Sequence, residues 1–203
     1  MRSPICVTLL ALVLGASVGT VQAYPRPASV SSRPEVEFQP GDLRLYQSPA
    51  GDYWYLIYDV VNTTGQDLTW APSMVLFTDR GEVLTDGQSV PRRMVQAVMD
   101  HVGDPLLEPK AAVIGRLRQG LGHARRGIAV WPAPRTDVNE LRVFVEGISA
   151  ESTVVEHPVT GEPVTLRKNL ALHYLVPGNP AALGDRPIGL HPDYAAEPHW
   201  IFR

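Results

Sequence analysis

The sequence has almost no cysteine, since Cys6 is the only one among 203 residues. It lies within a segment, 1–23, that has the pattern of a secretory signal peptide. Arg2 precedes a short apolar run and Val21-Gln22-Ala23 fits the cleavage site, so we expect the mature chain to begin at Tyr24. That chain would contain no cysteine. This excludes disulfide bonds and cysteine nucleophiles, and it favours a bacterial envelope or secreted protein.

A second long apolar run is also missing. The apolar part of 1–23 is shorter than the roughly 20 residues that a bilayer-spanning helix needs. We therefore expect cleavage and a secreted or periplasmic protein. A membrane would be contacted only through an uncleaved signal segment.

The chain lacks an excess of positive charge. Loss of 1–23 removes only Arg2 and leaves 17 basic and 21 acidic residues, a net charge of −4. This balance is not that of a nucleic-acid-binding protein, so we expect no nucleic-acid partner. The partner stays unknown at this point, with an envelope polymer or another exported protein as candidates.

Proline, serine and glycine gather at the two ends of the expected mature chain. This composition predicts a Pro/Ser-rich linker at 24–40 and an irregular Pro/Gly-rich tail at 179–203. The segment between them, 41–178, is long enough for one domain with a hydrophobic core.

Aromatic and β-branched residues dominate 53–61, which predicts a strand. Trp54 and Leu56 fall on one face, whereas Tyr55 and Ile57 fall on the other, so we expect this strand to be central. Further strands are predicted at 68–70, 73–78, 83–85, 111–114, 126–131, 140–148, 153–156, 163–167 and 170–176. The turns 62–65, 79–82 and 160–162 separate neighbouring strands.

One segment departs from the alternating pattern. Met94, Val98 and Val102 recur every four residues after Ser89, which predicts one short amphipathic helix near 90–102 with Ser89 as its cap. Many short strands with one helix are typical of a mainly β fold, a two-sheet β-sandwich.

Motifs for catalysis or metal binding are also missing. The nearest match to a G-x-S-x-G nucleophile elbow, around Ser149, lacks the second glycine. The densest group of metal-binding residue types is His191, Asp193, Glu197 and His199, which has no established ligand spacing. We therefore expect no enzyme activity, no cofactor and no metal. A hydrolase or metalloenzyme with a site assembled from distant residues remains an alternative.

Acidic residues are absent from 111 to 136, whereas Arg116, Arg118, Arg125 and Arg126 all lie there. Guanidinium groups bind carboxylate, sulfate and phosphate in bidentate geometry. These four arginines are therefore the candidate binding residues for an anionic ligand. The alternative is a solvated basic loop whose charge is balanced by acids elsewhere in the fold.

Three tryptophans lie in or beside strong strands. Trp54, Trp70 and Trp131 would serve as core residues or as a stacking platform for a sugar, and core packing is the favoured interpretation.

Several stretches resemble a group of uncharacterised exported bacterial proteins with an immunoglobulin-like β-sandwich. They are WYLIYDVVNTTGQDLTWAPSMVLFTDRGEVLTDG, GIAVWP, LRVFVEGIS and VTLRKNLALHYLVPG, within about 43–178. The strand and turn from Tyr58 to Gly65 follow the pattern Y-x-V-x-N-x-T-G. The resemblance implies an immunoglobulin-like sandwich and carries no active-site residues.

The sequence therefore predicts a non-catalytic exported β-sandwich that acts as an envelope or extracellular interaction module. The alternative is a carbohydrate- or anionic-ligand-binding domain that uses the arginine-rich region 110–135.

Overall fold

The computed structural model describes residues 25–28 and 31–203. The predicted signal peptide, 1–23, lies outside the described residues. The chain is mainly β, with 45% strand and 15% helix, which confirms the predicted class. No helix among the described residues has the length and apolar character needed to span a membrane.

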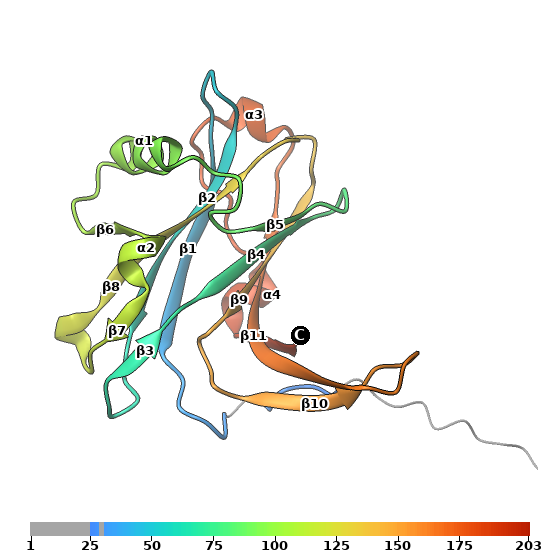
Figure 1. Ribbon diagram of the computed structural model, residues 1–203. Helices are drawn as coiled ribbons and strands as arrows, with labels where there is room; N and C mark the ends of the chain where they lie inside the picture. Colours follow the sequence, from blue (N-terminus) through green and yellow to red (C-terminus); the bar gives the residue numbers. More distant parts are fainter. Residues whose placement is uncertain (1–24, 29–30) are drawn as a thin grey trace, which may run out of the picture.

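The strands and helices follow one another along the chain as shown in Figure 1. The strands are β1 (Glu37–Tyr46), β2 (Tyr53–Val61), β3 (Leu68–Trp70), β4 (Ser73–Thr78), β5 (Val83–Thr85), β6 (Leu107–Pro109), β7 (Gly115–Leu117), β8 (Arg125–Pro132), β9 (Glu140–Glu146), β10 (Ser152–Glu156), β11 (Pro163–Leu175) and β12 (His199–Phe202). The helices are α1 (Arg92–Val102), α2 (Lys110–Val113), α3 (Pro180–Leu183) and α4 (Pro192–Ala196), with a 3-10 turn at Leu121–His123.

These strands form two larger sheets and one small one. The first sheet has the order β1-β2-β8-β6, in which only β6 runs parallel to its neighbour. The second has the order β10-β11-β9-β4-β5, with β12 also paired to β11. Strands β3 and β7 pair separately. The strand β2 is flanked by β1 and β8, which confirms its predicted central place.

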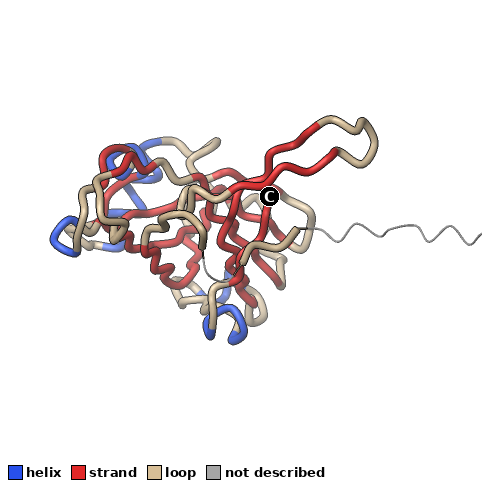
Figure 2. Tube along the Cα trace, turned by 90° about the horizontal axis from the view of Figure 1, so that it is seen from below, coloured by secondary structure: helices blue, strands red, loops and turns tan. Residues whose placement is uncertain are grey.

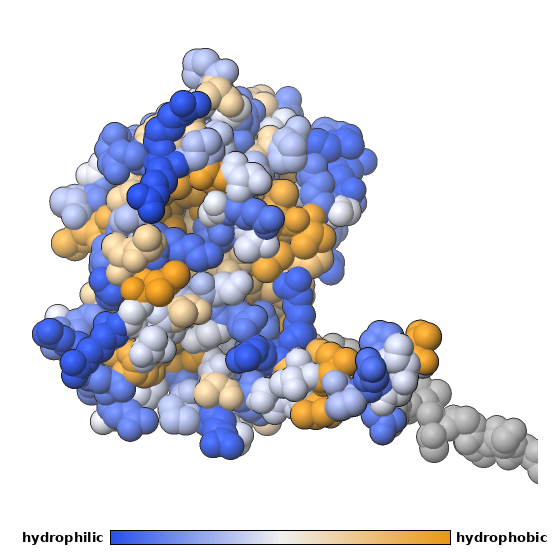
Figure 3. Space-filling view, viewed as in Figure 1, coloured by the Kyte–Doolittle hydropathy of each residue, from blue (hydrophilic) through white to orange (hydrophobic). Residues whose placement is uncertain are grey.

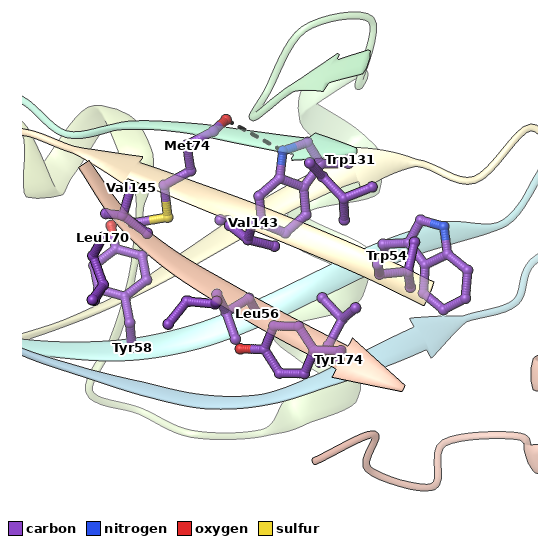
Figure 4. Packing of buried hydrophobic residues seen from close by; sticks show 14 of the residues in the cluster. Trp54, Leu56, Tyr58, Met74, Trp131, Val143, Val145, Leu170 and Tyr174 are labelled. Carbon is purple, nitrogen blue, oxygen red and sulfur yellow. Dashed lines mark hydrogen bonds between the residues drawn. The ribbon is translucent and has the colours of Figure 1, made fainter. Parts of the chain in front are cut away.

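The main core lies between the two larger sheets. Trp54 and Leu56 of β2 meet Val143 of β9 and Leu170 of β11 in one cluster of buried side chains (Figure 4), which also contains Leu172. This arrangement follows from the alternation of side chains along each strand, which sends every second residue inward. Burial of this apolar surface is the dominant stabilising contribution.

The tryptophans are core residues, as predicted. Trp54, Trp70 and Trp131 are all fully buried. The indole N–H of Trp70 donates to the carbonyl of Gly147 at 2.9 Å, and that of Trp131 donates to the carbonyl of Met74 at 3.4 Å. Their burial rules out a sugar-stacking platform made of these rings.

Helix α1 covers the other face of β2. Met94 and Val98 pack on Tyr55, Ile128 and Val130 in a second buried cluster, outside the first sheet. The predicted helix is therefore confirmed, but its predicted cap is wrong. Pro91 occupies the N-cap position without a side-chain hydrogen bond, because the chain turns at Ser89, whose φ is 60°.

The turn after β2 is held by a buried asparagine. The Asn62 side-chain amide donates to the carbonyls of Gln66 and Leu117 at 2.8 and 2.9 Å, and its oxygen accepts the Thr64 backbone N–H at 3.0 Å. This confirms the predicted turn, and both amide hydrogens are already used inside the fold.

Three predictions differ from the structure. The strand predicted at 111–114 is instead the helix α2, in which the Ile114 N–H donates to the Lys110 carbonyl at 3.0 Å. The tail predicted to be irregular contains two short helices and β12, whose Trp200 lies opposite Leu170. The expected strands 163–167 and 170–176 form one continuous strand, β11.

We predict that Gly127→Ala destabilises the fold by about 1–3 kcal/mol, the usual cost of overpacking. A Cβ atom at this position in β8 would overlap the ring and hydroxyl of Tyr58. Chemical denaturation measures the effect. Gly122→Ala is the control, because its Cβ would meet nothing within 4 Å. Equal stability of the two variants would contradict the packing described for Tyr58.

Candidate interaction surfaces

The structure pairs three of the four candidate arginines with carboxylates. The Arg125 guanidinium lies 2.6 Å from a carboxylate oxygen of Glu108. That of Arg126 lies 2.8 Å from Asp59 and 2.9 Å from Asp104. Asp59 is the cross-strand neighbour of Arg126 in β2, so this pair follows from the strand register.

The other two arginines lie near the small sheet. Arg116 donates two hydrogen bonds to one oxygen of Asp67, at 2.9 and 2.7 Å. The pKa of Asp67 is lowered, first by the backbone N–H of Gln119 and then by Arg116. Arg118 makes no hydrogen bond or ion pair with a described residue. Each paired arginine thus has its own carboxylate partner from outside 111–136. Binding of an anionic ligand by all four arginines stays a prediction.

A shallow apolar groove lies between α1 and the segment around α2. Its volume is about 480 Å³. One side is lined by Val95 and Met99 of α1 and by Val90, which precedes the helix. The other side is lined by Pro109 and Ile114. These side chains are only partly covered, and the Ile114 residue is 43% exposed. Apolar surface beside α2 is visible in Figure 3. The groove exists because the buried face of α1 is narrower than its apolar stripe.

Two cations border this groove. The Lys110 Nζ lies 3.3 Å from a carboxylate oxygen of Asp86 and donates to the Asp86 carbonyl at 3.1 Å. Asp86 is buried and also accepts the Val130 backbone N–H at 2.9 Å. Burial raises the pKa of Asp86, against the opposing effect of Lys110. Arg92, in contrast, is exposed and pairs with no described carboxylate.

The C-terminal segment carries a cluster of aromatic and imidazole rings. The rings of His173 and His191 are stacked with centroids 5.4 Å apart, and Tyr194 meets the edge of His173 at 5.3 Å. His199 stacks on Tyr194 at 4.0 Å. The His173 Nε2 lies 3.2 Å from a carboxylate oxygen of Glu140. This cluster fixes α4 on β11 by ring packing.

The described residues contain no group of three or more His, Cys, Asp or Glu side chains placed to hold a metal ion. Ser149 is the centre of the imperfect nucleophile motif. Its hydroxyl oxygen accepts the Glu151 backbone N–H at 3.1 Å and lies 3.4 Å from the hydroxyl oxygen of Ser31. No histidine that would act as a base is among its hydrogen-bond partners in the described part of the chain.

Comparison with protein-family models, curated proteins and solved structures found no match. Function is therefore inferred from the side chains themselves. The sequence did not predict the groove, because Met99 and Ile114 come together only when α1 and the segment around α2 pack in the fold. The one signal for it was an apolar stripe on 90–102 wider than a single buried face needs.

We predict that His173 makes the stability depend on pH. Its pKa is lowered, mainly by burial and then by Arg142, against the opposing effect of Glu140. An unfolded histidine has a pKa of about 6.5. Between the two values the folded state binds fewer protons, so the free energy of unfolding falls as the pH is lowered through this range.

Urea unfolding at about pH 7.5 and about pH 5.5 measures this effect. The His173→Gln variant is expected to lose less stability on acidification than the unaltered protein, since the other histidines are present in both. An identical loss in the two proteins would contradict the assignment.

Proposed function

We propose that this chain is an exported, non-catalytic, immunoglobulin-like β-sandwich that acts as a binding module. The signal-like segment 1–23 and the resemblance within 43–178 support export and this architecture. The face-to-face packing of the two larger sheets around one core is consistent with it. We further propose that the groove between α1 and α2 is its binding site.

The observation that carries this proposal is the combination of apolar walls and one unpaired cation. Val95, Met99 and Ile114 present partly exposed apolar surface to the groove. Binding sites for small or extended ligands are concave, mostly apolar, and oriented by a few polar groups. Lys110 already pairs with Asp86, so Arg92 is the cation of the groove that has no carboxylate partner among the described residues.

This geometry favours an apolar group that carries a negative charge. The apolar part would be removed from water against α1 and α2, and its anionic end would pair with the Arg92 guanidinium. The groove lies at the start of the arginine-rich region 110–135. None of the four candidate arginines of that region lines the groove, so this site differs from the anion site predicted from the sequence.

We predict that dodecanoate binds the protein more tightly than dodecyltrimethylammonium, because the two share an apolar chain and differ in the sign of the head group. Arg92→Glu is expected to weaken dodecanoate binding by about tenfold, which corresponds to about 1.4 kcal/mol. Titration calorimetry below the critical micelle concentrations measures both values.

Arg93→Glu is the matched control. Arg93 is the next residue of the same helix turn and is exposed, but it does not line the groove. A glutamate in the first turn of α1 suits the helix dipole at either position, so both variants should fold. Equal binding of the two head groups, or equal loss in the two variants, would overturn the proposed site.

A further inference from the structure

The β10–β11 hairpin projects from the body of the protein. Its stem pairs Ser152–Glu156 with Pro163–Arg167, whereas β9 and β12 pair only with the part of β11 from Lys168 onward. The stem therefore has two strands where the rest of the sheet has more, and Figure 2 shows it extending away from the other strands. A two-stranded ribbon by itself is only marginally stable in water.

One edge of this stem has unpaired backbone groups. The His157 N–H donates to Glu162 at 2.8 Å, and the Lys168 N–H donates to the carbonyl of Glu151 at 2.9 Å. In an antiparallel pair, alternate residues direct their backbone groups toward the partner strand. Glu151 and His157 are directed toward β11, so Ser152, Val154 and Glu156 direct their N–H and C=O groups away from it. No described residue pairs with those groups.

The opposite edge of the stem is protected. Pro163 has no N–H to offer at the start of β11. At the other end, Arg167 exchanges backbone hydrogen bonds with Arg203, at 2.8 and 3.0 Å. The β11 edge of the stem therefore has fewer unpaired backbone groups than the β10 edge.

The β10 edge is short and carries one charged residue, Glu156, but it lacks three other features that prevent strand pairing. Protected edges carry lysine, proline or a bulge, but β10 reads Ser-Thr-Val-Val-Glu and is regularly paired with β11 throughout. Val154 is 64% exposed, and Val159 at the tip is 86% exposed. Apolar atoms are visible on the projecting hairpin in Figure 3.

We propose that a second copy of this chain pairs with the β10 edge, antiparallel, about a two-fold axis through Val154. This register sets Val154 opposite its counterpart and Ser152 opposite Glu156. Every outward N–H and C=O group of these three residues is then hydrogen-bonded. A two-fold axis at another residue of β10 would leave some of these groups without a partner. The two hairpins become one continuous four-stranded ribbon.

The charges favour this occupant over an unrelated extended segment. In the chosen register Glu156 of one copy faces the small side chain of Ser152. The next residue on that face is Arg167, the cross-strand neighbour of Ser152. Its guanidinium is exposed and lies 3.4 Å from a carboxylate oxygen of Glu146, so Glu156 of the second copy would join an existing ion pair. Glu156 makes no side-chain hydrogen bond or ion pair with another residue that the structure describes. A two-fold axis at Glu156 would instead place like charges opposite each other.

The test uses sedimentation velocity of the protein produced from its complete coding sequence, over a range of concentrations. We expect a reversible monomer–dimer equilibrium, because one strand edge buries less surface than a standard interface. Val154→Pro should raise the dissociation constant at least ~10-fold. The Val154 N–H makes no bond to β11, so proline removes only the outward donor and the hairpin should persist.

Val159→Lys is the control for non-specific association, since it removes exposed apolar surface at the tip and leaves the edge unchanged. It should not alter the dissociation constant. Glu156→Arg should weaken the dimer, and the double variant Glu156→Arg with Arg167→Glu should restore it. Amide exchange should show protection of Val154 that increases with protein concentration.

Three other results would overturn the proposed dimer. A protein that stays monomeric at high concentration, with the Val154 amide unprotected, has no such dimer. A dimer that is insensitive to Val154→Pro uses another surface. Pairing of the β10 edge only with an added unrelated peptide would assign the edge to a different partner. The groove between α1 and α2 is not part of this surface, so the two proposals fail independently.

Discussion

The fold depends on the burial of β2 on both faces. Its inward side chains, Trp54 among them, fill the core between the two larger sheets, and its outward side chains, such as Tyr55, are covered by α1. Both faces of such a strand are apolar and are removed from water on folding, so each face must pack against another element. The position of α1 follows from this requirement. The groove beside α1 follows in turn, because only part of the helix's apolar stripe is needed for β2.

The two ends of the described chain meet at one buried lysine. Lys168 is fully buried, with its Nζ 2.8 Å from a carboxylate oxygen of Glu35 and 3.3 Å from one of Glu151. The same ammonium lies 4.6 Å from the ring centroid of Trp200 in β12. A buried charge is tolerated when it is paired in this way, and removal of one partner is costly. This cluster joins the segment before β1, the start of β10 and the C-terminal strand, directly beside the base of the projecting hairpin.

Local patterns in the sequence were enough to predict much of the fold. The alternation in 53–61 predicted a central strand, and the four-residue spacing of Met94 and Val98 predicted a helix. The same patterns gave the wrong structure for 111–114, because Ala and Val fit a short helix as well as a strand. Strand β12 was missed since its pairing with β11 is long-range. Short aromatic ends have no periodicity that reveals such pairing.

The candidate sites were less accessible to prediction. The arginines of 111–136 could be found by composition, but their acids, such as Asp59 and Asp67, come from other strands and turns. The groove and the free β10 edge are likewise properties of the assembled sheets. Sequence alone identifies which residues are apolar, and the fold decides which of them remain exposed.

Native-state hydrogen exchange of α1 and β2 measures whether the helix and the strand open together. If α1 is the cover of β2, the amides at the centre of α1, such as that of Val98, should exchange only through the same opening that exposes β2, with the same free energy. If α1 instead exchanges through a separate opening of much lower free energy while β2 stays protected, α1 is not a required cover of β2.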